Sequence, residues 1–209
     1  MKSNIDNMLA YYWDNCKGNF AHIKENWEIK PDSRRARQLY DAFLGSLELR
    51  GKTVIDYGCG GGWFGKLLFD EYKIGKYVGL DVAHRSLKRS HENLENYREN
   101  VKLKFANEDF GCFNADVFIS MAVIQHFPTV KYLDEFLVRL NTSGIQTIIL
   151  HVRYGEKTEY CNPYVNNRDV KDAGVTNERH IGRILTNYGH VYNYDAGASK
   201  AVYLKYELQ

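Results

Sequence analysis

The chain has 209 residues, of which 44% are hydrophobic and 14% aromatic, and its formal net charge is +2. This length and apolar content favour one ordered α/β domain, and the scattered charge gives no strong electrostatic footprint for nucleic acid. No apolar run approaches the ~18 residues of a membrane span. The start, MKSNIDNMLAYYWDNC, lacks the apolar stretch of a signal peptide, and the four cysteines are widely spaced. We therefore expect a cytoplasmic domain with free thiols.

The first 47 residues carry no strand signal. Within them, SRRARQLYDAFLGSL has a helical pattern that puts Leu39, Phe43 and Leu47 on one side. We predict that residues 1–47 form a helical cap on a Rossmann-like core that spans residues 48–209, the whole chain being a single domain.

From residue 53 onward, short apolar runs alternate with amphipathic segments of helical length. Continuous apolarity is typical of parallel strands that are covered on both faces. This β-α-β-α order predicts an α/β fold with a doubly wound, mostly parallel, Rossmann-like sheet. The predicted strands are 53–57, 77–82, 101–107, 115–123 and 145–153, and the predicted helices lie near 62–72, 84–98 and 129–141.

The C-terminal part departs from this repeat. Residues 154–176 are polar and without periodicity, and we expect a substrate loop there, because long structureless connections are usually lids or binding loops. Thr176 is the predicted N-cap of a helix that runs to about Tyr188, with Gly189 ending it. HVYNY and KAVYLKYEL flank DAGAS, which predicts a terminal antiparallel hairpin.

The segment VIDYGCGGGWFGKLL, residues 54–68, matches three nucleotide-binding patterns at once. Gly60 to Lys66 forms most of a Walker A loop, but Leu67 stands where that loop needs a Ser or Thr to hold Mg²⁺. The remaining two patterns are the dinucleotide fingerprint G-x-G-x-x-G and [DE]-x-G-x-G-x-G, which is the first motif of proteins that bind S-adenosylmethionine (SAM). Both begin after a buried strand and use the same glycines.

Two carboxylates bear on the choice between these cofactors. Asp81 ends the second predicted strand, where a ribose-binding acid belongs in either kind of site. Asp56 precedes the glycine turn, where a dinucleotide places its pyrophosphate. Each repelling charge pair would cost roughly 3 kcal/mol at ~5 Å and an effective dielectric of ~20. SAM instead brings a sulfonium and an ammonium group, which the same carboxylate attracts, so the sequence favours SAM over an NAD-dependent oxidoreductase.

In these motifs the chain resembles the class I SAM-dependent methyltransferases from about residue 50 to its end, particularly the small-molecule branch typified by quinone-biosynthesis enzymes. VIDYGCGGG resembles the family's first motif, and YVGLDV resembles the strand that ends in the ribose-binding acid. ANED falls at the position that recognises adenine, and MAVIQHFP resembles the segment after the fourth strand. The resemblance implies SAM as cofactor and S-adenosyl-L-homocysteine as product. The cofactor-binding residues that it implies are Asp56, Gly58, Gly60, Gly62, Asp81, Val82, Asn107, Glu108, Asp109 and Met121.

His126 is the candidate catalytic residue, since an imidazole with a pKa near 6.5 can accept a proton from a hydroxyl nucleophile. A histidine that only positions a helix entrance is the alternative. His151, Arg153 and Tyr154 lie at the end of the fifth predicted strand, at the sheet edge where open α/β sheets bind ligands, and are the substrate candidates. The segment after the fourth strand offers no acidic metal ligands, so we expect no metal.

The predicted reaction is methyl transfer from SAM to a small-molecule acceptor, a hydroxyl oxygen of a sugar or similar metabolite being favoured. Nitrogen and carbon acceptors are alternatives. Two further alternatives are an RNA- or protein-modifying methyltransferase, which predicts a basic face and salt-sensitive binding, and a non-catalytic SAM-binding protein. The sequence indicates neither the oligomeric state nor the pathway.

Overall fold

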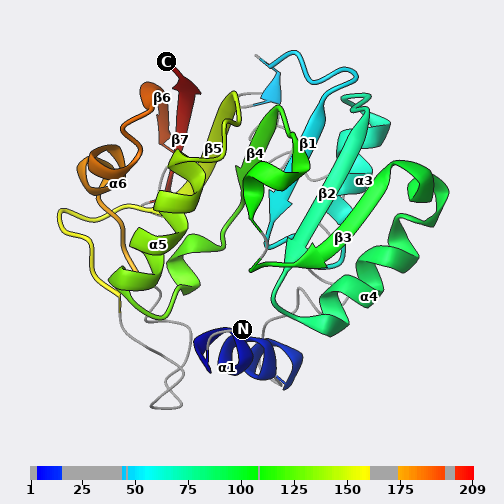
Figure 1. Cartoon of the computed structure of the whole chain (residues 1–209), viewed down its shortest axis with the longest axis horizontal. Helices are drawn as coiled ribbons and strands as arrows, with labels where there is room; N and C mark the ends of the chain where they lie inside the picture. Colours follow the sequence, from blue (N-terminus) through cyan, green and yellow to red (C-terminus); the bar gives the residue numbers. More distant parts are fainter. Residues whose placement is uncertain (1–3, 16–43, 46, 108, 161–173, 196–200) are drawn as a thin grey trace. The chain divides into compact units, whose positions relative to one another are not determined.

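The computed structural model describes residues 4–15, 44–45, 47–107, 109–160, 174–195 and 201–209 (Figure 1). These residues divide into two compact units, Met1–Glu108 and Asp109–Gln209. Of the predicted helical cap, the structure describes α1 (Asn4–Asn15), whereas Leu39 and Phe43 lie outside the described residues.

The first unit contains three parallel strands in the order β3-β2-β1. They are β1 (Thr53–Tyr57), β2 (Lys76–Asp81) and β3 (Val101–Phe105). Its helices are α1, α3 (Trp63–Asp70), α4 (His84–Asn93) and the 3-10 helix η2 (Glu95–Asn100), and α1 packs against α4. The predicted strands and helices between residues 53 and 105 are therefore present, with ends that differ by a few residues.

Differences in burial explain why the apolar patterns of these three strands differ in the sequence. All of β2 except Lys76 is buried, as is all of β1 except Thr53, so continuous apolarity is the expected pattern. In β3, by contrast, half-buried residues alternate with the exposed Lys102 and Lys104. A strand with lysines on its outer positions is typical of the edge of a sheet, where charge discourages pairing with another chain.

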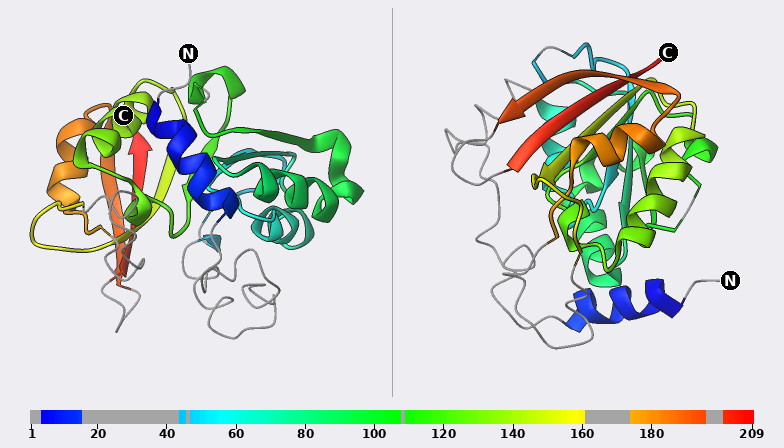
Figure 2. Two further views of the ribbon diagram at one scale, coloured as in Figure 1. Left: turned by 90° about the horizontal axis from the view of Figure 1, so that it is seen from below. Right: turned by 90° about the vertical axis from the view of Figure 1, so that its left-hand side faces the viewer.

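The second unit contains four strands in the order β4-β5-β7-β6. Strands β4 (Val117–Ser120) and β5 (Thr147–Arg153) are parallel, whereas β6 (Tyr188–Asp195) and β7 (Ala201–Leu208) form the predicted antiparallel hairpin, with β7 next to β5 (Figure 2). Its helices are α5 (Val130–Asn141), α6 (Glu178–Ile184) and the 3-10 helices η3 (Phe110–Phe113) and η4 (Ile124–His126).

An aromatic cluster forms the core of the second unit. The ring of Phe136 on α5 lies 5.9 Å from that of Phe118 on β4, 5.7 Å from that of Phe110 and 5.1 Å from that of Phe127, measured between centroids. All four residues are buried. Edge-to-face pairs of this kind add to the free energy gained from burial alone, so the cluster fixes α5 on β4.

The helix expected after the substrate loop was placed wrongly. Its N-cap is Asn177, whose side chain accepts a hydrogen bond from the backbone of Arg179, and the helix ends at Ile184. Thr176 instead forms a β-bridge with Tyr154. Gly189 ends no helix, because it lies within β6 and pairs with β7. Strand pairing here outweighs the local helical pattern, which a single sequence does not reveal.

We predict that Phe136→Ala lowers the free energy of unfolding by about 3–5 kcal/mol, because it removes the ring that all three partners contact. Urea denaturation followed by circular dichroism measures the loss. Val138→Ala on the same helix is the control, since Val138 is 53% exposed, and a change within about 0.5 kcal/mol is expected there. Equal effects of the two substitutions would contradict the assignment of Phe136 to the core.

Candidate functional site

The glycine turn joins β1 to α3. Gly58, Gly60 and Gly62 all have positive φ, of 80°, 54° and 79°, which is the left-handed region that other residues rarely adopt. The backbone N–H groups of Gly58 and Cys59 both donate to the carbonyl oxygen of Leu80, at 2.7 and 3.1 Å. The turn is therefore fastened to the carboxyl end of β2.

Asp81, the last residue of β2, completes this fastening. Its Oδ2 accepts a hydrogen bond from the backbone of Gly60 at 2.9 Å, and its Oδ1 accepts one from Ala83 at 2.8 Å. Burial raises the pKa of Asp81 to about 6, although the backbone donors act in the opposite direction. A carboxylate has more acceptor positions than these two bonds occupy, so Asp81 retains the capacity to accept hydroxyl groups of a ligand.

Asp56 lies on β1, opposite Gly79 of β2 in the register of the two strands. It is 3% exposed, and its Oδ2 accepts a hydrogen bond from the hydroxyl of Tyr77 at 2.6 Å. Burial is the main cause that raises the pKa of Asp56 to about 7, and the charge of Asp81 adds to it. Within the part of the chain that the structure describes, no salt bridge joins either carboxylate to a cation.

Helix α1 reaches this part of the first unit. Asp14, near its C-terminus, accepts a hydrogen bond from the backbone of Arg85 at 3.0 Å, and the guanidinium of Arg85 donates to the carbonyl of Asp14 at 3.0 Å. The charge of Asp14 also contributes to the raised pKa of Asp81. The described part of the predicted cap thus ends beside the candidate ribose-binding acid.

The other predicted cofactor residues are spread over both units. In the first, Val82 is half-buried directly after Asp81, and Asn107 is exposed after β3. Glu108 lies outside the described residues. In the second, Asp109 caps η3 by accepting the backbone N–H of Gly111 at 3.1 Å. Met121 is half-buried and follows β4. These four described residues remain candidates.

In the second unit, His151 supports the chain after β4. Its Nδ1 accepts a hydrogen bond from the backbone of Ala122 at 3.1 Å, and Ala122 has a φ of 56°, which is costly for a residue with a side chain. The ring of His151 also packs at 4.5 Å from that of Tyr203. Burial lowers the pKa of His151 to about 4, so the ring is neutral at pH 7 and carries its proton on Nε2.

His126, the candidate base, is the half-buried last residue of η4. The backbone of Gly174 donates to the carbonyl of Gln125 at 2.8 Å. The far end of the predicted substrate loop is thereby attached to the turn that carries His126.

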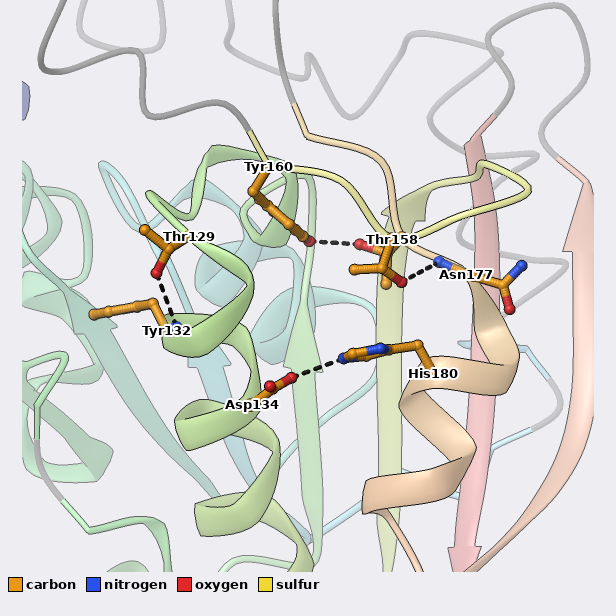
Figure 3. A network of polar contacts seen from close by, with 8 residues as sticks. Thr129, Tyr132, Asp134, Thr158, Tyr160, Asn177 and His180 are labelled. Atoms are coloured by element: carbon orange, nitrogen blue, oxygen red, sulfur yellow. Dashed lines mark hydrogen bonds and ion pairs between the residues drawn. The ribbon is translucent and has the colours of Figure 1, made fainter.

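Residues 154–160 and 174–177 are joined by hydrogen bonds at the two ends of the predicted substrate loop, and we call these residues the loop base (Figure 3). Thr176 donates its backbone N–H to Arg153 at 2.8 Å, and the hydroxyls of Tyr160 and Thr176 lie 2.5 Å apart. The backbone N–H of Asn177 donates to the hydroxyl of Thr158 at 3.0 Å. Arg153 and Tyr154, the other substrate candidates, therefore begin an ordered segment, and Tyr154 is 40% exposed.

The described residues contain neither a metal cluster nor a membrane-spanning helix. No group of three His, Cys, Asp or Glu side chains among them comes together as a metal site. None of the helices in the described ranges is long and apolar enough to cross a membrane.

We predict that acid destabilises the protein through His151. As the pH falls from about 6.5 to about 4, the unfolded chain takes up a proton on this residue and the folded protein does not, so stability is lost over that window. His151→Asn keeps an acceptor near the Ala122 N–H but does not titrate. Relative to this variant, the wild type loses about 2–3 kcal/mol between pH 6.5 and pH 4, measured by urea denaturation. Parallel pH profiles of the two proteins would contradict the prediction.

A family model described as a methyltransferase domain matches residues 48–188. The magnesium protoporphyrin IX methyltransferase from Synechocystis PCC 6803, solved with bound SAM, is similar with a TM-score of 0.69 and 15% identity, over 100% of this chain and 99% of that one. The methyltransferase domain of bacterial CtHen1-C is similar with a TM-score of 0.63 and 20% identity, over 83% and 97%. These likenesses confirm the predicted Rossmann-like fold with a C-terminal antiparallel hairpin.

Curated relatives match a shorter stretch. Ribosomal protein L11 methyltransferase from Vibrio campbellii is 44% identical over 55 residues, or 25% of this chain and 18% of that protein. The enzyme of the same name from Escherichia coli strain SMS-3-5 is 33% identical over 82 residues, or 37% and 27%. The chain thus matches about a quarter or less of the length of these relatives. The family match over residues 48–188 gives the conclusion that the chain belongs to the methyltransferase-domain family.

Proposed function

We propose that this methyltransferase transfers the methyl group of SAM to a hydroxyl oxygen of a small metabolite. The observation that carries the proposal is the hydrogen-bonded base of the loop after β5, which joins the turn of His126 to Arg153 through Gly174 and Thr176. A candidate base and a candidate substrate-binding cation thus belong to one polar framework, which suits a hydroxylated acceptor. The full-length likeness to an enzyme whose name specifies magnesium protoporphyrin IX also supports a small acceptor.

The residues of the first unit fit SAM. Two buried carboxylates that pair with no cation among the described residues suit a ligand that brings its own positive charge. The left-handed glycine turn also suits a bound ligand. A Cβ built on Gly60 meets nothing within 4 Å, so the backbone there is open to a ligand. We assign Asp81 to the ribose hydroxyls, Asp56 to the cationic end, and Val82 and Asn107 to the region of the adenine, with Asp109 and Met121 as further candidates.

When bound, SAM supplies a methyl group that is already activated by its positively charged sulfur. The protein's own tasks are then positioning and proton transfer, and positioning alone can contribute a large part of the rate. In our proposal His126 accepts the proton of the attacking hydroxyl. His151 serves as a donor through Nε2 and not as a base, because Nδ1 accepts the Ala122 N–H and the pKa is about 4. Arg153 and Tyr154 orient the acceptor.

A protein acceptor is the second candidate, and the relatives favour it through their names: they are ribosomal protein L11 methyltransferases with identities up to 44%. That match covers 25% of this chain, whereas the structural likeness to the protoporphyrin enzyme covers all of it. So short a match leaves most of the chain outside it, and loops elsewhere in the chain are expected to choose the acceptor. We therefore rank the small acceptor first.

The two candidates differ in where the methyl group goes. We predict that the protein, incubated with methyl-labelled SAM and a cell extract, places the label in a compound that passes a small-pore ultrafiltration membrane, separates from SAM by chromatography and is absent when the protein is omitted. Asp81→Ala, which removes the candidate ribose-binding carboxylate, is the control and is expected to label nothing. Label that appears instead in a retained, protease-sensitive fraction would overturn the small acceptor and support the protein one.

We predict that His126→Asn lowers kcat by about 100-fold, because loss of a general base typically costs two or more orders of magnitude. SAM affinity, measured by calorimetry, is expected to stay unchanged. His190→Asn is the matched control, since His190 is exposed on β6, and it is expected to retain wild-type kcat. Wild-type kcat in His126→Asn would assign His126 a positional role only.

A further inference from the structure

The Asp56 carboxylate receives its hydrogen bond from Tyr77, a residue that is not among the predicted cofactor-binding residues. We propose that Tyr77 is a positioning residue of the cofactor site, whose hydroxyl holds the Asp56 carboxylate in place and ionised for the positive charge of SAM. This inference rests on the role proposed above for Asp56.

The strand register brings the two side chains together. Side chains alternate between the faces of a strand, so Tyr77, Gly79 and Asp81 share one face of β2. Asp56 of β1 is paired with Gly79, which places it on the same face, between the two polar residues of β2. The Tyr77 hydroxyl donates to Oδ2 of Asp56 at 2.6 Å, and Tyr77 is fully buried.

Two glycines from different elements leave room for this ring. A Cβ built on Gly65 of α3 would lie 2.6 Å from Cζ of Tyr77, and one built on Gly79 would lie 2.9 Å from its Cε1. Both distances are too short for real contacts, and a ring buried on all sides cannot move aside. A smaller apolar residue at position 77 would fill a strand position without requiring Gly65, whereas a Cβ on Gly79 would also meet Leu103 at 2.7 Å. The arrangement thus accommodates a phenol that reaches Asp56.

The Tyr77 hydroxyl affects the ionisation of Asp56 because of the charges that surround this carboxyl group. Burial is the largest cause that raises the pKa of Asp56, and the hydrogen bond from Tyr77 opposes it. Asp81 on β2 and Cys59 in the turn are the other titratable groups that act on Asp56 or Tyr77, Asp14 acts in turn on Asp81, and none of the three brings positive charge. Burial also raises the pKa of Tyr77 well above its usual value, so its hydroxyl keeps the proton that it donates. Removing the hydroxyl leaves the carboxylate buried with less support for its ionised form.

The test is the pH dependence of SAM binding, measured by titration calorimetry from pH 5.5 to pH 8.5 with the full chain. Wild-type affinity is expected to fall as the pH drops below about 7. In Tyr77→Phe the midpoint moves up by about one pH unit, so that affinity is about ten-fold lower than wild type at pH 6 and within about two-fold at pH 8.5. Tyr188→Phe is the matched control, since it removes a buried tyrosine hydroxyl in the second unit that bonds Ser143 and Leu140, and its profile is expected to follow the wild type.

Asp56→Asn separates this inference from the one on which it rests. It is expected to remove the step near pH 7, and Tyr77→Phe in that background is expected to add no pH dependence. If Asp56→Asn keeps the wild-type affinity and profile, the proposed role of Asp56 fails. If it removes the step while Tyr77→Phe keeps the wild-type midpoint, or loses affinity by the same factor at every pH, Tyr77 is a structural residue and the present inference alone is overturned.

Discussion

Burial of two carboxylates at the carboxyl ends of neighbouring parallel strands is the constraint on which the candidate site depends. Asp56 and Asp81 are 3% and 8% exposed, and burial raises the pKa of both. Hydrogen bonds from Tyr77 and from backbone N–H groups reduce the cost of their charge without cancelling it. We propose that a ligand with positive charge completes the balance, which would link the local electrostatics of the first unit to the choice of SAM over a pyrophosphate-containing cofactor.

The polar side chain of His151 in the second unit is neutral, in contrast to the two carboxylates of the first unit. His151 is held neutral and uses its free nitrogen to fix a backbone turn in which Ala122 has a positive φ. Strain of this kind persists only where the surroundings hold it, and the contact of His151 with Tyr203 is part of what holds it here. The turn leads into η4 and His126, which the loop base contacts through Gln125. In our proposal, these contacts hold the candidate base and the ends of the predicted substrate loop for positioning of the acceptor.

The sequence predicts the first unit well because its signals are local. Buried parallel strands, a glycine turn and acids at strand ends are all read from spacing, and β1, β2 and the fold class are confirmed. Contacts that depend on register are not visible in this way: Tyr77 reads as an ordinary strand residue, and only its pairing across β1 and β2 shows the bond to Asp56. The helix cap at Asn177 was missed because Thr176 is taken up by a bridge with Tyr154. The left-handed Ala122 has no sequence signal at all.

Counting the protons released on binding shows whether Asp56 meets a cation in its ionised form. Titration calorimetry of SAM binding in buffers that differ in ionisation enthalpy gives the number of protons released per ligand. Because the pKa of Asp56 is about 7 without ligand, the account predicts that binding at pH 7 releases about half a proton and that the release vanishes toward pH 9. Binding that releases no proton at pH 7, or that takes one up, would contradict it.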